Sequence, residues 1–387
     1  MKKGIVLVGS NFTRNNKNRD GNCLRLTNIY SSFLLLGVEV RFISIDTNNL
    51  EFNNDPNIYR FKSLMNLGPL RSISFDALKM ISNMLNDSNN IIIFEGLHPS
   101  LLSLFLPKKF KSRIYISLID FTTYAVFRCL LSKISILNFF KQSLILLERF
   151  FCDLLISLTP YKLFFVSEND ANLYKKFFKR ETFIYTNGVQ CQDYSYLLNN
   201  DNKAFNVLYL ANMTSPMNKE AREWILRNLI SNSLNIKNTN IKFFIIGLNA
   251  HSSDLMRDSI IRSLIEQDYL KIVSSPDVLD LYFQKANLQI CPMQYGTGIK
   301  NTVLEGMSFG VPQLVTPLIA SPIGIKNNYT GFVSKRDLFF KCIFELSKSE
   351  NFDKLKSISE ESWRLINKNF AWKNVVNDFL IRNNFYK

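Results

Sequence analysis

Residues 291–312 read CPMQYGTGIKNTVLEGMSFGVP and carry the clearest structural signal in the chain. The run Leu288–Cys291, which is apolar except for Gln289, ends at a proline, and a loop with Gly296 and Gly298 follows it. Apolar residues at helical spacing then begin near Asn301 and continue to the Gly-Val-Pro that closes the stretch. A strand, a glycine loop and a helix N-terminus in this order favour a phosphate, because backbone N–H groups and the helix dipole attract an anion.

Two polar side chains of this stretch each have two interpretations. Lys300 adds a positive charge at the end of the glycine loop, either as a phosphate ligand or as an exposed cation. Glu305 stands three residues after Thr302, the spacing of a capping box, and a ligand-binding role is the alternative. The loop matches neither a Walker sequence nor G-x-G-x-x-G, so the residues alone indicate an anion site and no particular nucleotide.

Short apolar runs alternate with longer amphipathic runs along the chain. The strands predicted in the first half are Ile5–Val8, Val38–Ile45, Ile91–Phe94, Arg113–Ile119, Leu154–Leu158, Leu163–Val166 and Thr182–Tyr185. The helices predicted between them are Leu24–Leu36, Phe75–Leu85, Arg128–Cys152 and Glu168–Phe178. The strands predicted in the second half are Asn206–Leu210, Lys242–Ile246, Leu270–Val273, Leu288–Cys291 and Gln313–Thr316. This alternation indicates parallel sheets that are covered by helices on both faces.

The restart of the pattern predicts two domains. We expect an α/β protein with two doubly wound, Rossmann-like domains that face each other across a cleft. Residues 1–190 form the first domain, the polar, Asn-rich residues 191–204 form a linker, and residues 205–370 form the second domain. A last helix in residues 371–387 follows the second sheet, and we expect it to return to the first domain.

The composition narrows the function classes. The 387 residues are 47% hydrophobic and carry 47 Lys and Arg against 32 Asp and Glu, a net charge of +15, which favours anionic substrates, lipid surfaces or polyanions. Six dispersed cysteines and two histidines indicate reduced thiols in a cytoplasm and argue against a zinc site. No recognisable nucleic-acid module is present, so we expect no nucleic-acid partner.

Residues 296–312 resemble the donor-binding signature of group 1 glycosyltransferases, the retaining family 4 with the two-domain GT-B fold. Five further segments resemble family positions in the same order, namely Phe164–Asp170, Thr186–Val189, Ser215–Asn218 with Trp224, Phe244–Gly247 and Phe370–Trp372. The resemblance implies an enzyme that moves a sugar from a nucleotide-sugar to a growing, lipid-linked surface glycan, such as a polysaccharide, lipopolysaccharide or capsule, with retention. The alternative is a sugar-nucleotide epimerase or hydrolase of the same fold.

The resemblance also implies roles for individual residues. Glu305 would hold the ribose hydroxyls of the donor, and Lys219 would neutralise phosphate. The backbone that would lie against the diphosphate belongs to Gly296, Thr297, Gly298, Ile299, Lys300 and Asn301. Two positions depart from the family pattern, because Thr297 replaces a common glutamate and Ala211–Met213 lacks a common arginine. We expect Lys300 to supply part of that missing charge, and we expect no metal or other cofactor.

Polar residues at the predicted strand ends of the first domain are candidates for the acceptor side. Ser10 and Asn11 follow the first strand, His98 follows Ile91–Phe94, and Asp120 ends Arg113–Ile119. The carboxyl edge of a parallel sheet is where catalytic groups gather. The catalytic candidates are therefore Asp120 and His98, with Lys300 from the second domain. A turn-capping role for Asp120 and a structural role for His98 are the alternatives.

The aromatic and basic stretch 124–158 also has two interpretations. Phenylalanines alternate there with Arg128, Lys133, Lys141 and Arg149. Such a segment lies on an anionic membrane surface in one interpretation and is a core helix with a solvated basic side in the other. No uninterrupted apolar run reaches the roughly 18 residues of a membrane span. We therefore expect a cytoplasmic protein that is either free or held peripherally at the inner face of the cell membrane.

Overall fold

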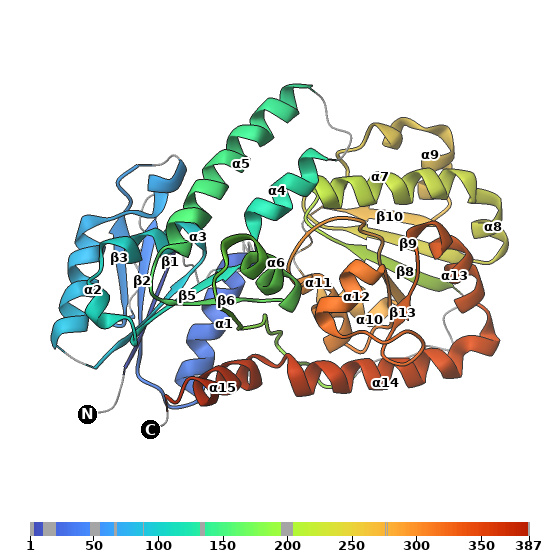
Figure 1. Ribbon diagram of the computed structural model, residues 1–387. Coiled ribbons are helices and arrows are strands. Elements are labelled where there is room, and N and C mark those ends of the chain that lie inside the picture. Colours follow the sequence, from blue (N-terminus) through green and yellow to red (C-terminus); the bar gives the residue numbers. More distant parts are fainter. Residues whose placement is uncertain are drawn as a thin grey trace. The chain divides into compact units, whose positions relative to one another are not determined.

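The protein is described by a computed structural model that covers residues 4–10, 21–46, 55–65, 68–87, 89–131, 136–194, 204–274, 276 and 278–385 (Figure 1). The chain divides into two compact units. Unit 1 comprises residues 1–188, 297–299 and 372–387, and unit 2 comprises residues 189–296 and 300–371. Each unit is a parallel sheet with helices packed against it, and each is described by itself below.

The sheet of unit 1 has the strand order β3-β2-β1-β4-β5-β6-β7, and all its neighbours are parallel. Its strands are β1 (Ile5–Ser10), β2 (Val40–Asp46), β3 (Ile58–Lys62), β4 (Ile91–Glu95), β5 (Ile114–Ile119), β6 (Lys162–Phe165) and β7 (Thr182–Ile184). Its α-helices are α1 (Gly21–Leu35), α2 (Phe75–Asp87), α3 (Leu97–Ser100), α4 (Thr122–Leu130), α5 (Ile136–Ser157), α6 (Glu168–Phe178) and α15 (Trp372–Arg382). The order changes direction between β1 and β4, which is the ligand-binding point of doubly wound sheets.

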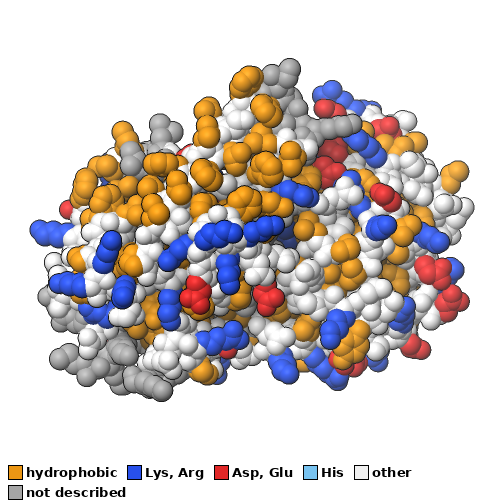
Figure 2. All heavy atoms as spheres, in the orientation of Figure 1, with side chains coloured by type: hydrophobic (Ala, Val, Ile, Leu, Met, Phe, Trp, Pro, Cys, Tyr) orange, Lys and Arg blue, Asp and Glu red, His pale blue; other side chains and the backbone are white. Residues whose placement is uncertain are grey.

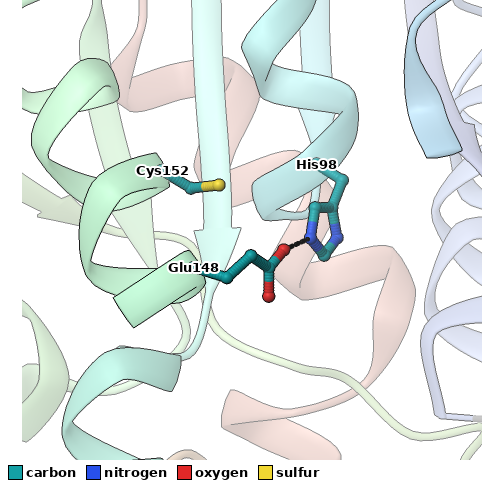
Figure 3. A group of neighbouring side chains, drawn as sticks. All are labelled: His98, Glu148 and Cys152. Carbon is teal, nitrogen blue, oxygen red and sulfur yellow. Dashed lines mark hydrogen bonds and ion pairs between the residues drawn. The ribbon is translucent and has the colours of Figure 1, made fainter. Parts of the chain in front are cut away.

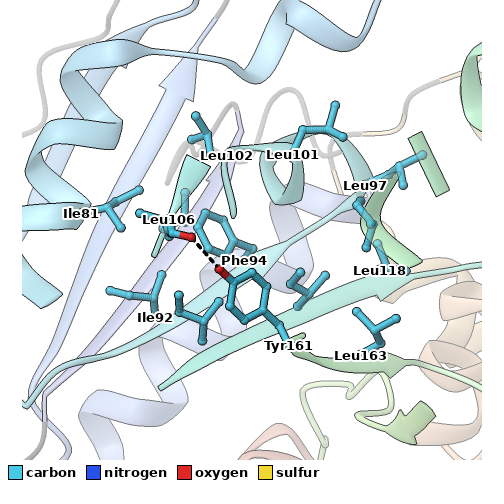
Figure 4. Packing of buried hydrophobic residues seen from close by; sticks show 14 of the residues in the cluster. Ile81, Ile92, Phe94, Leu97, Leu101, Leu102, Leu106, Leu118, Tyr161 and Leu163 are labelled. Carbon is cyan, nitrogen blue, oxygen red and sulfur yellow. Dashed lines mark hydrogen bonds between the residues drawn. The ribbon is translucent and has the colours of Figure 1, made fainter. Parts of the chain in front are cut away.

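The two faces of this sheet build separate cores. Ile5 and Leu7 belong to one cluster with residues of α1 and α15, whereas Val6 and Val8 belong to the other. This alternation follows from the two-residue period of a strand. Figure 4 shows part of the second cluster, in which the hydroxyl of Tyr161 donates to the carbonyl of Leu106 at 3.0 Å.

The sheet of unit 2 has the order β10-β9-β8-β11-β12-β13, again parallel throughout. Its strands are β8 (Phe205–Leu210), β9 (Ile241–Ile246), β10 (Leu270–Val273), β11 (Leu288–Cys291), β12 (Gln313–Val315) and β13 (Phe332–Val333). Its α-helices are α7 (Pro216–Ser231), α8 (Ser233–Asn238), α9 (Ser259–Glu266), α10 (Asp280–Lys285), α11 (Asn301–Ser308), α12 (Pro317–Ile323), α13 (Phe339–Leu346) and α14 (Phe352–Asn369). The direction changes between β8 and β11, so the glycine loop that follows β11 lies at this point.

Two secondary-structure predictions are wrong. Leu154–Leu158 is not a strand but the end of α5 and the residue after it, with Ile156 fully buried while Leu154 and Leu158 are 37% and 74% exposed. A short apolar run does not separate strand from helix by itself, and here the burial follows the helical period. The predicted helix Arg128–Cys152 is divided between α4 and α5, and residues 132–135 between them lie outside the described part. The edge strand β3 was not predicted because its residues are only partly buried.

The predicted linker and the predicted C-terminal helix can be compared with the two units. Most of the predicted linker, residues 195–203, lies outside the described residues. The last helix, α15, packs in unit 1, where Trp372, Val376 and Phe379 join the cluster of α1. Of the helices described, none has the length and apolar character needed to cross a bilayer.

Candidate functional site

The loop between β11 and α11 has the backbone of an anion site. Gly296 and Gly298 have positive φ angles of 139° and 71°, a region that side chains with a Cβ rarely adopt. Helix α11 then begins at Asn301, as the sequence predicted. The first N–H groups of a helix have no partner within the helix, so this N-terminus offers donors to an anion.

Lys300 lies at the N-cap of α11 and brings a positive charge to the same loop. Its Nζ lies 3.6 Å from Sδ of Met217, which belongs to the first turn of α7. A Cβ added to Gly296 would come within 3.3 Å of the same Nζ and 3.0 Å of the same sulfur. Lys219, in that first turn of α7, is exposed. The loops after β8 and β11 therefore meet at the point where the sheet order changes direction.

The capping-box interpretation of Glu305 is wrong. A capping box needs Thr302 at the N-cap, but the helix begins at Asn301 with Lys300 as N-cap, so Thr302 lies inside the first turn. Glu305 is half-buried on α11. Its ligand-binding role stays a prediction, as do those of Thr297 and Ile299 in the loop.

A cavity of about 590 Å³ lies in unit 1 where its own sheet changes direction. The ends of three strands and the face of α5 form its walls. The polar and charged residues that line it are Ser10, Arg71, Ser72, Glu95, His98, Asp120, Thr122 and Arg149. Three predicted acceptor-side residues, Ser10, His98 and Asp120, are therefore brought together, whereas Asn11 lies outside the described residues.

The backbone before Asp120 is strained. Ile119 has a φ of 68°, and the pairing of β5 with β6 shifts register between Ser117 and Ile119. A β-branched residue in the left-handed region is a genuine outlier, and such outliers gather at functional sites. The irregularity at the end of β5 accompanies the placement of Asp120 in the cavity wall.

His98 lies in a group of charged side chains at one end of the cavity. Its Nε2 lies 2.7 Å from Oε1 of Glu148, and Figure 3 shows the two side chains pointing toward each other. Its Nδ1 lies 2.9 Å from Nη2 of Arg71, which is always a donor, so Nδ1 accepts and Nε2 carries the hydrogen. Nη1 of Arg149 is within 3.3 Å of both ring nitrogens. Burial and these arginines lower the pKa of His98 to about 4, so the ring is neutral at pH 7.

The same group has the residue types of a metal site but not its chemistry. Ligand atoms of His98, Glu148 and Cys152 lie within 4.8 Å of one another. Burial raises the pKa of the Cys152 thiol to about 11, so the thiolate that a metal requires is disfavoured. Two guanidinium groups beside the imidazole also repel a cation. We therefore assign no metal to this group.

A buried arginine connects the cavity wall to two segments that resemble family motifs. Arg25 donates to Glu95 at 3.1 Å and to Oδ1 of Asn187 at 2.6 Å. Its guanidinium also lies over the ring of Tyr185, 4.7 Å from the centroid. A Cβ on Gly188 would lie 2.5 Å from the ring of Trp372, so the glycine of the Asn-Gly-Val segment makes room for the tryptophan of the Phe-Ala-Trp segment.

Comparison with known proteins gives the family. The profile described as "Glycosyl transferases group 1" matches residues 204–346, which include the whole β11–α11 loop. Residues 204–346 form a group 1 glycosyltransferase domain. A search of curated protein sequences gives no match.

Solved structures extend the likeness to the whole chain. Sucrose-phosphate synthase from Thermosynechococcus elongatus is 14% identical, with a TM-score of 0.71 over 100% of both chains. WaaG, a glycosyltransferase involved in lipopolysaccharide biosynthesis, is 11% identical, with a TM-score of 0.66 over 97% of this chain and 99% of WaaG. Anabaena Alr3699/HepE in complex with UDP and glucose is 10% identical, with a TM-score of 0.67 over 97% of this chain and 98% of that one. These likenesses confirm the GT-B fold of the whole chain. The glycosyltransferase assignment itself rests on the profile match to residues 204–346.

Sequence reasoning about this glycosyltransferase missed the cations of the cavity. Arg71 comes from a short 3-10 turn, Gly68–Ser72, and Arg149 from the middle of α5. Neither arginine follows a strand. The expectation that residues directly after parallel strands gather at one edge of the sheet, which located His98 and Asp120, therefore does not apply to them. One sequence feature could have indicated Arg149. It stands four residues after Ile145, so the two side chains lie on the same face of a helix, and both line the cavity.

Proposed function

We propose that the enzyme transfers a sugar from a nucleoside-diphosphate sugar, bound at the β11–α11 loop, to a growing lipid-linked surface glycan. The observation that carries the proposal is the loop itself, with two glycines at positive φ, a helix N-terminus and Lys300 at its cap. Preorganised N–H groups and a fixed cation stabilise the negative charge that develops on a leaving diphosphate. We propose that the reaction needs no metal and retains the anomeric configuration.

The relatives support the donor class. Alr3699/HepE has been solved with UDP and glucose and with UDP-glucose. In the present enzyme we propose that Lys300 and Lys219 neutralise the diphosphate, and that Glu305 holds the ribose. The amides of Gly296, Thr297, Ile299 and Asn301 would complete the donor site. The amide of Gly298 donates to Oδ2 of Asp170 at 2.9 Å, so a phosphate there would have to replace that carboxylate.

Unit 1 is the proposed acceptor side. Asp120, after the strained Ile119, is our candidate for contact with the reacting acceptor. Both ring nitrogens of His98 already lie at hydrogen-bonding distance from neighbouring side chains, so we propose that this residue positions Arg71, Arg149 and Glu148 rather than moving a proton. Ser10 shares a hydrogen bond of 2.8 Å with Ser72 at the cavity wall.

A surface on α4 and α5 supports contact with a membrane. Its exposed apolar side chains, which we term the α4–α5 surface, are Phe127, Phe139, Phe140, Leu144, Leu147, Phe150, Phe151 and Leu154. Hydrophobic side chains gather over α5, with Lys and Arg side chains next to them (Figure 2). Arg128 and Lys141 are exposed on the same two helices. An apolar patch with basic side chains suits an anionic lipid surface, where a lipid-linked acceptor would lie.

The donor site is tested by a thermal-shift panel with UDP, GDP, ADP, CDP and CMP. A ligand that binds the native state raises the melting temperature by mass action. We expect one of the nucleoside diphosphates to raise the melting temperature of the wild-type enzyme. Lys300→Ala should weaken the binding of that nucleotide about tenfold, which is the cost of one charge-assisted hydrogen bond. The matched control is Lys356→Ala, an exposed lysine of α14. No shift with any nucleotide, or equal shifts in both variants, would contradict the proposed site.

Membrane contact is tested by sedimentation with phosphatidylglycerol vesicles. The variant Phe140→Ser/Leu144→Ser removes two side chains of the α4–α5 surface that are 64% and 70% exposed. We expect it to bind vesicles about a hundredfold more weakly than wild type, because each of the two apolar side chains contributes about 1.5 kcal/mol or more when buried in the bilayer. Leu234→Ser, in a leucine of α8 that is 75% exposed, is the control. Equal vesicle binding by wild type, the double variant and Leu234→Ser would contradict the proposal that the α4–α5 surface contacts the membrane.

A further inference from the structure

The charged end of the unit 1 cavity has a role that the donor site does not explain. We propose that Arg71 and Arg149 bind a phosphate or diphosphate group carried by the acceptor. This inference rests on the proposed function, because it names the chemistry of the molecule that receives the sugar. It concerns residues of unit 1 only.

Two guanidinium groups converge on one imidazole at this end of the cavity. Nη2 of Arg71 lies 2.9 Å from Nδ1 of His98, and Nη1 of Arg149 lies 3.1 Å from Nε2. Two cations this close raise the energy of the unliganded site. Accordingly, burial and the charge of Arg149 lower the pKa of Arg71. An anion between the two guanidiniums would offset this repulsion.

The carboxylates nearby do not neutralise both arginines. Glu148 lies 2.7 Å from His98 and 3.3 Å from Nε of Arg149. Within the described ranges, no carboxylate lies at ion-pair distance from Arg71. Among the side chains in direct contact, two guanidiniums face one carboxylate and a neutral imidazole. Asp120 lines the same cavity, and Asp153 interacts with Arg149 without an ion-pair contact among the described residues. The planar fork of arginine matches phosphate oxygens in pairs, which makes it a preferred phosphate ligand.

The remaining walls of the cavity favour an amphiphilic ligand. Much of the lining is apolar, and it includes Leu26, Leu97, Leu118, Val126 and Ile145. Ile145 and Arg149 line the cavity from α5, whereas other side chains of the same helix form the exposed α4–α5 surface. One helix thus carries both a wall of the charged pocket and an exposed apolar surface. A lipid-linked phosphate fits this arrangement, with its phosphate at the arginines and its lipid chain toward the apolar residues. A soluble sugar phosphate carries the same anionic group and would bind the same arginines.

The sequence offers a local spectroscopic probe, because it contains only two histidines. Enzyme with ¹⁵N-labelled histidine, saturated with the nucleoside diphosphate that gives the largest thermal shift, is titrated with inorganic diphosphate and with geranyl diphosphate. The His98 signal is assigned by its loss in His98→Gln. We expect the anion to raise the pKa of His98 by about one unit or more, because it offsets the charge of Arg71 and Arg149.

Two variants and a control establish the site. Arg71→Gln and Arg149→Gln should each weaken diphosphate binding about tenfold, as expected for a lost charge-assisted hydrogen bond. Part of the Arg71 side chain is exposed, although its guanidinium is partly buried against His98, so its variant is expected to fold. Arg41→Gln changes a surface arginine of β2 that is paired with Glu39, and it should bind as wild type.

The outcomes separate the sources of the phosphate. Tighter binding of geranyl diphosphate than of inorganic diphosphate supports a lipid-linked acceptor, and equal binding supports a soluble phosphorylated one. A His98 signal that responds to neither, or that responds only to phosphatidylglycerol vesicles, overturns the proposal, as does wild-type affinity in Arg71→Gln. Nucleotide thermal shifts that still depend on Lys300 would then leave the proposed donor site standing, so the two failures are distinguishable.

Discussion

The two sheets of this glycosyltransferase have the same strand order around their first strand but different chemistry at the point where that order changes direction. In unit 2 the loop after β11 presents backbone, with Gly296 at positive φ and the N-terminus of α11 a few residues further along the chain. In unit 1 the corresponding place presents side chains, among them Glu95 and His98. Backbone N–H groups suit the diphosphate of the proposed donor, whereas side chains would set the charge and shape that select the proposed acceptor.

This difference has an energetic consequence. Where a site is built from buried charges, the stability of the fold depends on each partner of an ion pair. A carboxylate left unpaired in the interior strongly destabilises the folded state. A crevice built from backbone depends instead on the absence of Cβ atoms. Substitutions in unit 1 should therefore act mainly by leaving a buried charge unpaired, and substitutions in the glycine loop by adding a Cβ atom.

The largest expected effect follows from removing the central cation of unit 1. Arg25→Met leaves the buried Glu95 without its 3.1 Å partner and should lower the free energy of unfolding by about 3–5 kcal/mol. Burial already raises the pKa of Glu95, so the loss should be smaller at an acidic pH, because protonation removes the unpaired charge, than at pH 8. Urea unfolding at both pH values measures the effect.

The matched control is the double variant Arg25→Met/Glu95→Gln. It removes the unpaired charge and should recover part of the lost stability. A double variant as unstable as the sum of both single variants would show that the pair is not coupled.

The second prediction concerns Asp153, next to the charged group of the cavity. Burial raises the pKa of this carboxyl to about 7, although Thr123 donates to it at 2.5 Å. The folded protein then holds a proton that the unfolded protein has released above about pH 4, so stability is lost as pH rises toward and through 7. Asp153→Asn mimics the protonated form. Its stability relative to wild type should increase between pH 4 and pH 8 by up to about 4 kcal/mol, at about 1.4 kcal/mol per unit.

Thermal unfolding of both proteins across this range measures the difference. The pKa of His98 is lowered, so its own contribution to stability changes with pH in the opposite sense, but it is present in both proteins and cancels. Asp353→Asn, at an exposed position of α14, should show no such change. If the stability difference between Asp153→Asn and wild type did not change with pH, the raised pKa of Asp153 would be contradicted.

The smallest expected effect is a loss of binding in unit 2. Gly296→Ala places a Cβ within 3.0 Å of Met217 and 3.3 Å of Lys300, and nucleoside-diphosphate affinity should fall about tenfold, or about 1.4 kcal/mol. Gly324→Ala is the control, because its φ is also positive, at 78°, but no atom lies within 4 Å of the new Cβ. Both variants should lose about 1–2 kcal/mol of stability from backbone strain. Calorimetric titration should show weaker binding in Gly296→Ala alone.

The sequence predicted the sheets well because their strands are short, buried and apolar, and this signal is local. It failed at Leu154–Leu158, where an apolar run of the same length ends a helix. Residues at strand ends, such as His98 and Asp120, could be placed because the topology of a parallel sheet brings those ends together. Arg71 could not be placed, because its contact with His98 depends on the path of a short turn and on the reach of a long side chain.

The resemblance to a family pointed to the segments around Gly188 and Trp372 without giving a reason for them. The structure supplies it, because the glycine leaves room for the indole ring and Asn187 binds the buried Arg25. These are packing requirements between segments far apart in the chain. No local pattern of polarity encodes them.

The position of α15 has a consequence for the order in which the chain becomes stable during synthesis. The strands of unit 1 emerge from the ribosome first, but Phe379 of α15 stacks on Tyr185 and helps to close a core shared with β1. The whole of unit 2 is made before that residue. Unit 1 therefore begins its core earliest and completes it last, so we expect the nascent first half to hold an open sheet face until the final helix has been translated.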